Sequence, residues 1–241
     1  MTSTTDTTAF EALSSELDAR GRLSALEAYA LCDDATSLAV DVFNVYRKVE
    51  SNYPADEINR EALDASVSLS DVLRGLMFIL SESGVDVSDV CSDAAAAGAR
   101  ADALETLAGL HNFERAVDAD PTRATLLEAG YCEAEALRDA LGCRGGLSAL
   151  EAYALYGPAL DVTRAAGTVK CFVERNASPV DCTRAARRLM RGLARLLSLV
   201  VNELAYGIDV ASVSERAASF GASSETLAAL AADHCDKALG L

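Results

Sequence analysis

The sequence predicts an all-α protein in which two tandem repeats pack as a pseudo-twofold helical bundle. The first observation is a repeated segment: residues 23–31 read LSALEAYAL and residues 147–155 read the same, at an offset of 124. The second is composition. Ala, Leu and Val dominate a hydrophobic fraction of 51%, Trp is absent and aromatic residues make up 5%, which favours packed helices over a sheet. The third is the recurrence of apolar residues at intervals of three and four, as on one face of an α-helix.

A second echo supports the duplication. Residues 84–87 (GVDV) return as residues 207–210 (GIDV), and the only two histidines, His111 and His234, are likewise 123 residues apart. One residue was therefore gained or lost between the two blocks, and so long a period marks two copies of a domain rather than a solenoid of short units. We predict a disordered Ser/Thr-rich tail at 1–9, a first repeat at 10–117, a linker at 118–125 and a second repeat at 126–241.

The helices of the first repeat follow from apolar spacing and from stop signals. Gly21 ends the first helix, Cys32-Asp33-Asp34 interrupts the second, and residues 51–54 (SNYP) form a turn. Gly84 ends a long third helix. The predicted helices span residues 10–20, 23–49 with that interruption, 55–83, 87–97 and 101–113.

The second repeat follows the same plan. Gly157-Pro158 stands where the interruption falls in the first repeat, and residues 176–179 (NASP) match the turn. No segment shows the alternation expected of a strand. The predicted helices span residues 126–141, 147–175, 180–206, 210–220 and 224–239.

The charge balance excludes several classes of partner. The net charge is −16, and residues 1–120 hold 23 Asp and Glu against 8 Lys and Arg. Such a surface disfavours nonspecific binding to nucleic acid or to anionic membranes, because both need basic groups. No apolar run approaches the ~20 residues that span a bilayer, and the N-terminus lacks the features of a signal peptide. We therefore expect a cytoplasmic, intracellular protein.

Carboxylates on neighbouring helices are the strongest indication of chemistry. Seven cysteines without a CxxC pair and two separate histidines give little support to a zinc site or a Ser-His-Asp site. On the long helix, spacings of three and four put one set of oxygen donors on a single face: Glu61, Asp64, Ser68 and Asp71. Asp41 and Asn44 share a face of the preceding helix. If these helices pack antiparallel, the donors converge and would suit Mg²⁺; the alternative is a solvated acidic face.

A family resemblance bears on the same residues. Residues 38–45 (LAVDVFNV) resemble the second-helix motif of the MazG-like, all-α nucleoside triphosphate pyrophosphohydrolases, which reads Leu, small, any, Glu, Val, Gly, Glu, Leu. Residues 68–71 (SLSD) stand where that family has an ExxD motif, and Gly84 follows Asp71 by 13 residues, as the pattern requires. In the second repeat, residues 165–169 keep Gly167 but neither Glu.

The resemblance implies Mg²⁺-dependent hydrolysis of a nucleoside triphosphate to the monophosphate and pyrophosphate, with a degenerate site here. The family's four acids correspond to Asp41, Asn44, Ser68 and Asp71, of which two are acidic. In the second repeat none is acidic, since the corresponding residues are Ala165, Thr168, Arg191 and Ala194. Glu61 and Asp64 form an alternative ExxD motif. Three hypotheses remain open: a non-catalytic nucleotide-binding or scaffold protein, a divergent pyrophosphohydrolase, and a helical assembly protein unrelated to nucleotides.

The second repeat also carries a run of arginines. At the offset of 123, Glu61, Asp64 and Ser68 correspond to arginines, and the full set comprises Arg184, Arg187, Arg188, Arg191 and Arg195. One interpretation is that these side chains form structural ion pairs with the acids of the first repeat. The other is that they hold a polyphosphate or an acidic partner. A nucleotide, a protein partner or a second copy in a homodimer are therefore the expected partners.

Overall fold

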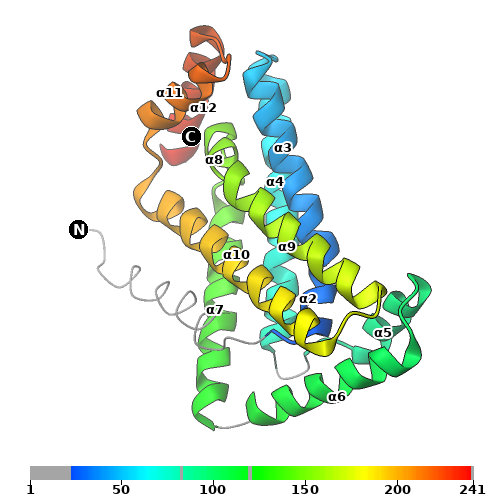
Figure 1. The fold of residues 1–241 in the computed structure, drawn as a ribbon. Helices are drawn as coiled ribbons and strands as arrows, with labels where there is room; N and C mark the ends of the chain where they lie inside the picture. Colours follow the sequence, from blue (N-terminus) through cyan, green and yellow to red (C-terminus); the bar gives the residue numbers. More distant parts are fainter. Residues whose placement is uncertain (1–22, 82–83, 119–120, 240–241) are drawn as a thin grey trace.

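All regular structure in the described part of the chain is α-helical, as predicted. The computed structural model describes residues 23–81, 84–118 and 121–239. The predicted tail at 1–9 and the predicted helix at 10–20 lie outside these residues. The helices are α2 Ala25–Ala30, α3 Cys32–Glu50, α4 Ala55–Leu80, α5 Val87–Ala96, α6 Ala101–Asp118, α7 Pro121–Cys143, α8 Ala149–Ala154, α9 Tyr156–Glu174, α10 Pro179–Tyr206, α11 Val210–Ser219 and α12 Ser224–Leu239 (Figure 1).

The repeated nine-residue segment folds the same way in both places. Each copy begins with a capping box, in which a serine hydroxyl accepts the N–H of the third helical residue and a glutamate accepts the serine N–H. For Ser24 and Glu27 these distances are 3.1 and 2.9 Å, and for Ser148 and Glu151 they are 3.3 and 2.7 Å. The identical sequence thus starts α2 and α8 identically.

Several predicted boundaries need correction. The first interruption falls at Leu31, just before the predicted residues, and the matching one in the second half falls at Leu155, two residues before the predicted Gly157-Pro158. Pro158 does not break α9, because it lies in the first turn, where its missing N–H costs no hydrogen bond. The predicted linker at 118–125 is shorter, since α6 reaches Asp118 and α7 begins at Pro121.

The two long helices of each half form antiparallel hairpins. Between α3 and α4, Lys48 lies opposite Glu61 and Asp41 lies opposite Ser68, which is the register of antiparallel helices. Both hairpin turns are Schellman motifs, closed by the N–H of Tyr53 to the carbonyl of Lys48 (3.1 Å) and by that of Ala177 to Phe172 (2.9 Å). The condition under which the oxygen donors of α3 and α4 were expected to converge, antiparallel packing, is therefore met.

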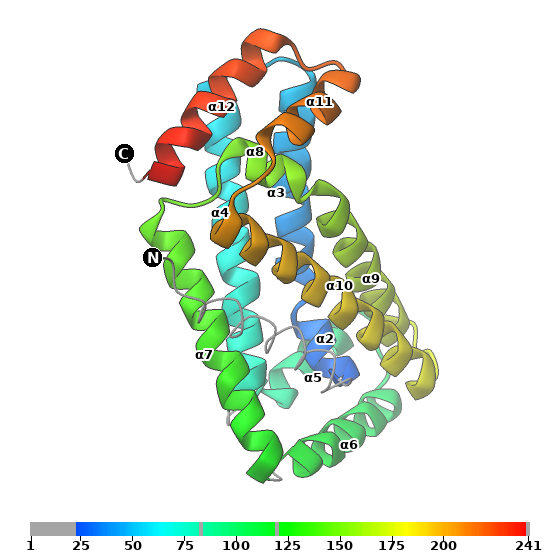
Figure 2. The same cartoon turned by 90° about the vertical axis from the view of Figure 1, so that its left-hand side faces the viewer.

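The centre of the molecule is the contact between α3 and α9. Buried alanines allow the two helices to approach closely, so that the Cys32 thiol donates to the carbonyl of Ala166 (3.2 Å) and the Thr163 hydroxyl donates to that of Ala35 (3.3 Å). Figures 1 and 2 show α5 and α6 beside the turn between α9 and α10, and α11 and α12 at the opposite end beside the turn between α3 and α4.

Contacts between the halves come in matching pairs. Asn176 accepts the N–H of Arg100 at the start of α6 (2.6 Å), and Asn52 accepts the N–H of Ser223 at the start of α12 (2.5 Å). Both asparagines have a left-handed backbone, with φ of 58° and 56°, so each closes its own turn and binds the other half. In the same way, the hydroxyl of Tyr29 donates to Glu174 (3.2 Å) and that of Tyr153 donates to Glu50 (3.4 Å).

The burial pattern fixes how the two halves align. At an offset of 124, buried residues of α4 coincide with buried residues of α10: Ile58 with Cys182, Ala62 with Ala186, Leu69 with Leu193, Leu73 with Leu197 and Leu76 with Val200. The offset of 123 applied to this helix from the sequence is therefore wrong by one residue, and the length change falls after α4. Among the described residues, no helix combines the length and hydrophobicity needed to cross a membrane.

Candidate functional site

The predicted oxygen donors lie along the hairpin of α3 and α4. Asp41 and Ser68 meet there, because the Ser68 hydroxyl donates to the Asp41 carboxylate at 2.5 Å. In the resemblance, Ser68 takes the position of a metal-binding glutamate. In this chain the same position donates a hydrogen bond to the acid that it was expected to assist.

The other two central carboxylates have basic partners. Glu61 lies 2.7 Å from the ammonium group of Lys48 on α3, and Asp71 lies 2.8 Å from the guanidinium of Arg74 one turn further along α4. Lys48 is largely shielded from solvent, with 15% of its side chain exposed, so its pair with Glu61 is screened less than one at the open surface. The acids are thus balanced by hydrogen bonds and cations of the same hairpin.

Sequence reasoning missed one further acid, Asp34. Burial raises the pKa of its carboxyl group, and the nearby charges of Asp71 and Asp33 raise it further, while Arg74 lowers it. A signal was available, because Asp34 precedes Asp41 by seven residues and so shares its helix face. Asp34 therefore belongs to the acidic face that includes Asp41 and Asp71.

Two of the predicted donors make no hydrogen bond or ion pair with this group among the described residues. Asp64 is exposed on the outer side of α4, and Asn44 is half-buried on α3. Within the described ranges, no three His, Cys, Asp or Glu side chains are grouped so that they could hold a metal ion. The hairpin brings together Asp41 with Ser68, and Asp34 with Asp71, but not the whole predicted set.

The arginines of α10 point into solvent. Arg184 pairs with Asp181 on its own helix (2.9 Å), and the Arg191 side chain donates to the carbonyl of Arg187 (3.4 Å). All five side chains of this set are exposed: Arg184, Arg187, Arg188, Arg191 and Arg195. Among the described residues, no ion pair joins these arginines to the acids of α3 and α4. With the corrected alignment, Asp64 and Asp71 correspond to Arg188 and Arg195.

Both histidines bind the serine caps of the repeated segment. The Nδ1 atoms of His111 and His234 lie 2.9 Å from the hydroxyls of Ser24 and Ser148. In the second half, the Glu151 carboxylate approaches the same Nδ1 atom of His234 at 3.9 Å. A Ser-His-acid relay needs the serine and the acid on opposite ring nitrogens, and Ser148 is fully buried. This arrangement therefore anchors α12 to the start of α8.

The second half contains a partly buried charge cluster next to that anchor. Arg144 binds Glu151 at 2.8 Å, and Glu203 of α10 lies close to both. Burial and the charge of Glu151 raise the pKa of Glu203 to about 8, while Arg216 and Arg144 oppose the shift. One carboxylate oxygen of Glu203 and one guanidinium nitrogen of Arg144 are buried without a hydrogen-bond partner. At the offset of 124, Glu203 replaces Ile79, which is buried in the first half.

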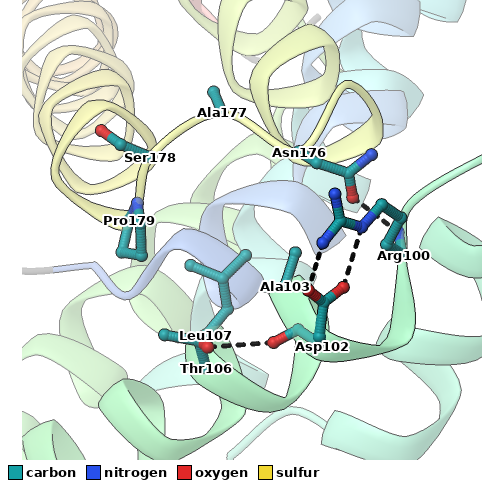
Figure 3. Close-up of a pocket in the computed structure, with 9 residues that line it drawn as sticks. All are labelled: Arg100, Asp102, Ala103, Thr106, Leu107, Asn176, Ala177, Ser178 and Pro179. Carbon is teal, nitrogen blue, oxygen red and sulfur yellow. Dashed lines mark hydrogen bonds and ion pairs between the residues drawn. The ribbon is translucent and has the colours of Figure 1, made fainter.

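A surface pocket of about 220 Å³ lies where the start of α6 meets the turn before α10. Figure 3 shows its lining residues: Arg100, Asp102, Ala103, Thr106, Leu107, Asn176, Ala177, Ser178 and Pro179. The Arg100 guanidinium lowers the pKa of Asp102 through an ion pair, and the N–H of Arg100 binds Asn176. The charged groups of this pocket are thus already paired with each other, as expected of a junction between the two halves.

Comparison of the chain with protein-family models, with curated proteins and with solved structures found no match. The MazG-like resemblance therefore rests on the sequence motifs quoted above.

Proposed function

We propose that the protein is a non-catalytic helical binding or scaffold protein that retains a MazG-like framework with a degenerate site. The observation that carries this proposal is the hydrogen bond from Ser68 to Asp41 at 2.5 Å. A serine donor at this position satisfies the carboxylate without a metal ion. The pairs between Lys48 and Glu61 and between Arg74 and Asp71 act in the same direction.

The residues present do not fit the Mg²⁺ ion that the resemblance implies. Mg²⁺ prefers near-octahedral oxygen ligands, usually with one or two protein carboxylates and several waters or phosphate oxygens. Two of the four expected acids are Asn44 and Ser68. A cation binding at Asp41 or Asp71 would compete with the Ser68 hydroxyl or with the Arg74 guanidinium. We therefore derive no catalytic step through a metal.

The architecture completes this proposal. The two halves would be copies of one unit related by a pseudo-twofold axis, which is supported by the nine-residue identity and by the matching contacts of Asn52 with Asn176 and of Tyr29 with Tyr153. The second copy would then serve to stabilise the first, because its positions corresponding to Asp41 and Asp71 are Ala165 and Arg195.

A divergent Mg²⁺-dependent nucleoside triphosphate pyrophosphohydrolase is the second candidate. One observation favours it: Asp34 joins Asp41 and Asp71 on the same face, and burial and neighbouring acids raise its pKa. Perturbed carboxyl groups of this kind are common at catalytic sites, although structural clusters produce them too.

Calorimetry with a non-hydrolysable nucleotide, with and without Mg²⁺, and a pyrophosphate-release assay over several NTPs and dNTPs separate these candidates. The proposal predicts no release of pyrophosphate above the blank. Release that disappears in Asp71→Ala but persists in the exposed control Asp64→Ala would instead establish the divergent enzyme. Nucleotide binding without turnover would identify a nucleotide as the ligand, and no binding would leave a protein partner.

A further inference from the structure

Three exposed arginines of α10 form a continuous strip over its central turns. Arg188, Arg191 and Arg195 follow one another at intervals of three and four and so lie on one side of the helix. No described acidic side chain is paired with any of these three. Over seven residues the strip extends about 10 Å along the axis. We call these three residues the arginine strip.

The first half carries an acidic strip with the same spacing. On and next to α5, Asp86, Asp89 and Asp93 are exposed and also follow at intervals of three and four. Helix α5 contains no Lys or Arg. Asp86 caps the helix by accepting the N–H groups of Ser88 and Asp89, and its carboxylate still contributes negative charge to this side.

The residues of each strip can be compared with those at the matching positions of the other half. Helix α11 is the counterpart of α5 in the second half, and at the offset of 123 Asp89 and Asp93 correspond to Ser212 and Arg216. On α4, the counterpart of α10, the positions of Arg191 and Arg195 hold Val67 and Asp71. One half thus carries the acidic strip and the other half carries the arginine strip. The two halves therefore differ in charge in a complementary way along these helices.

We propose that the arginine strip docks on the acidic strip of a second copy of this chain. Three Asp and three Arg with equal spacing on straight helices can form several ion pairs at once, whereas each pair alone at a surface contributes little. The contact joins two different surfaces, so it is heterologous, and a pair of copies keeps one free strip of each kind. The expected product is a ring or an open chain of copies. This inference concerns assembly and is independent of whether a nucleotide binds.

Sedimentation velocity at high protein concentration, in about 0.02 M and in about 0.5 M salt, tests the proposal. The electrostatic screening length differs several-fold between these two salt concentrations. The wild-type chain is expected to associate in low salt, with an association constant at least about tenfold lower in high salt. Arg191→Glu/Arg195→Glu and Asp89→Arg/Asp93→Arg should each be monomeric. An equimolar mixture of the two variants should associate again, because each mixed contact pairs opposite charges.

A matched control separates local complementarity from net charge. Arg60→Glu/Arg164→Glu makes the same charge change as Arg191→Glu/Arg195→Glu at exposed arginines outside both strips, and it should associate like the wild type. Circular dichroism of every variant confirms that it is folded. A wild-type chain that stays monomeric in low salt, or a variant mixture that fails to associate, would overturn the proposal. Binding of inorganic polyphosphate to the arginine strip of a monomeric chain would also overturn it.

Discussion

At the scale of single residues, Glu203 is the group whose environment departs most from the repeat. Its counterpart Ile79 is buried and apolar, whereas the Glu203 carboxyl group lies among Glu151, Arg144 and Arg216. A carboxyl group with a raised pKa binds its proton more tightly in the folded state than in the unfolded state. Above pH 4.5 the unfolded chain releases this proton more readily than the folded protein does, so Glu203 lowers stability at neutral and alkaline pH.

The pH dependence of stability follows from this residue. The pKa of Glu203 rises from 4.5 to about 8 on folding, so its contribution to stability is fully present below pH 4.5 and is lost as the pH rises through 8. At pH 9 we expect the free energy of unfolding of Glu203→Gln to exceed that of the wild type by about 2 kcal/mol. Urea unfolding from pH 5 to pH 9 measures this. The exposed control Glu225→Gln should show the same decrease of unfolding free energy with pH as the wild type. The same decrease in Glu203→Gln would contradict the assignment of the raised pKa to Glu203.

A second prediction concerns Asn176, which combines a left-handed backbone with a hydrogen bond to Arg100. Asn176→Gly keeps the backbone conformation and loses the hydrogen bond, so it should cost about 1 kcal/mol. Asn176→Ala should cost about 1 kcal/mol more, because a Cβ atom disfavours this conformation. Chemical denaturation of both variants measures the difference, and Asn52 provides an independent repeat of the experiment. Equal stability of the Gly variant and the wild type would show that the bond between halves contributes nothing.

At the scale of elements, the start of α8 depends on a buried cap. The Ser148 hydroxyl accepts the N–H of Glu151 and also binds His234, so Ser148→Ala leaves two buried polar groups without partners. We expect a loss of about 2 kcal/mol in unfolding free energy. The control is Asp209→Ala, which removes the exposed cap of α11, where water can replace the lost acceptor, and it should cost less than about 1 kcal/mol. Equal losses would mean that the histidine contact does not stabilise the cap.

The helices themselves were largely predictable from the sequence, because apolar periodicity and stop signals are local. The breaks between helices at Leu31 and Leu155 were harder to predict. A capping box fixes where α2 and α8 start, but no Gly or Pro marks where they end. The candidate site was predicted in part. Antiparallel packing correctly brought Asp41 to Ser68, but spacing alone could not show that Lys48 and Arg74 would neutralise Glu61 and Asp71.

The contacts between the two halves could not be predicted from local sequence patterns. Asn176 and Arg100 are 76 residues apart, and neither the turn nor the helix start shows in its own sequence which partner it will meet. The register of the repeat was also ambiguous, because two offsets were present and only the burial of α4 and α10 chooses 124 for these helices. A one-residue shift changes which acids and arginines correspond.

At the scale of the whole molecule, the matching contacts predict cooperative folding. The hydrogen bonds from Tyr29 to Glu174 and from Tyr153 to Glu50 join the halves, as do the buried contacts between α3 and α9. We expect one unfolding transition, with the same midpoint by far-UV circular dichroism and by tyrosine fluorescence. Two separated transitions would show that the halves are independent domains.

The central claim is that the acidic face between α3 and α4 is satisfied by the protein's own side chains rather than by Mg²⁺. Calorimetric titration of Mg²⁺ into the wild type and into Asn44→Glu/Ser68→Glu, which places acids at all four positions of the resembled motif, tests it most directly. The account predicts no saturable Mg²⁺ binding to the wild type at millimolar concentrations, and binding at least about tenfold tighter to the double variant. One tight Mg²⁺ site on the wild type, lost in Asp71→Ala, would contradict it.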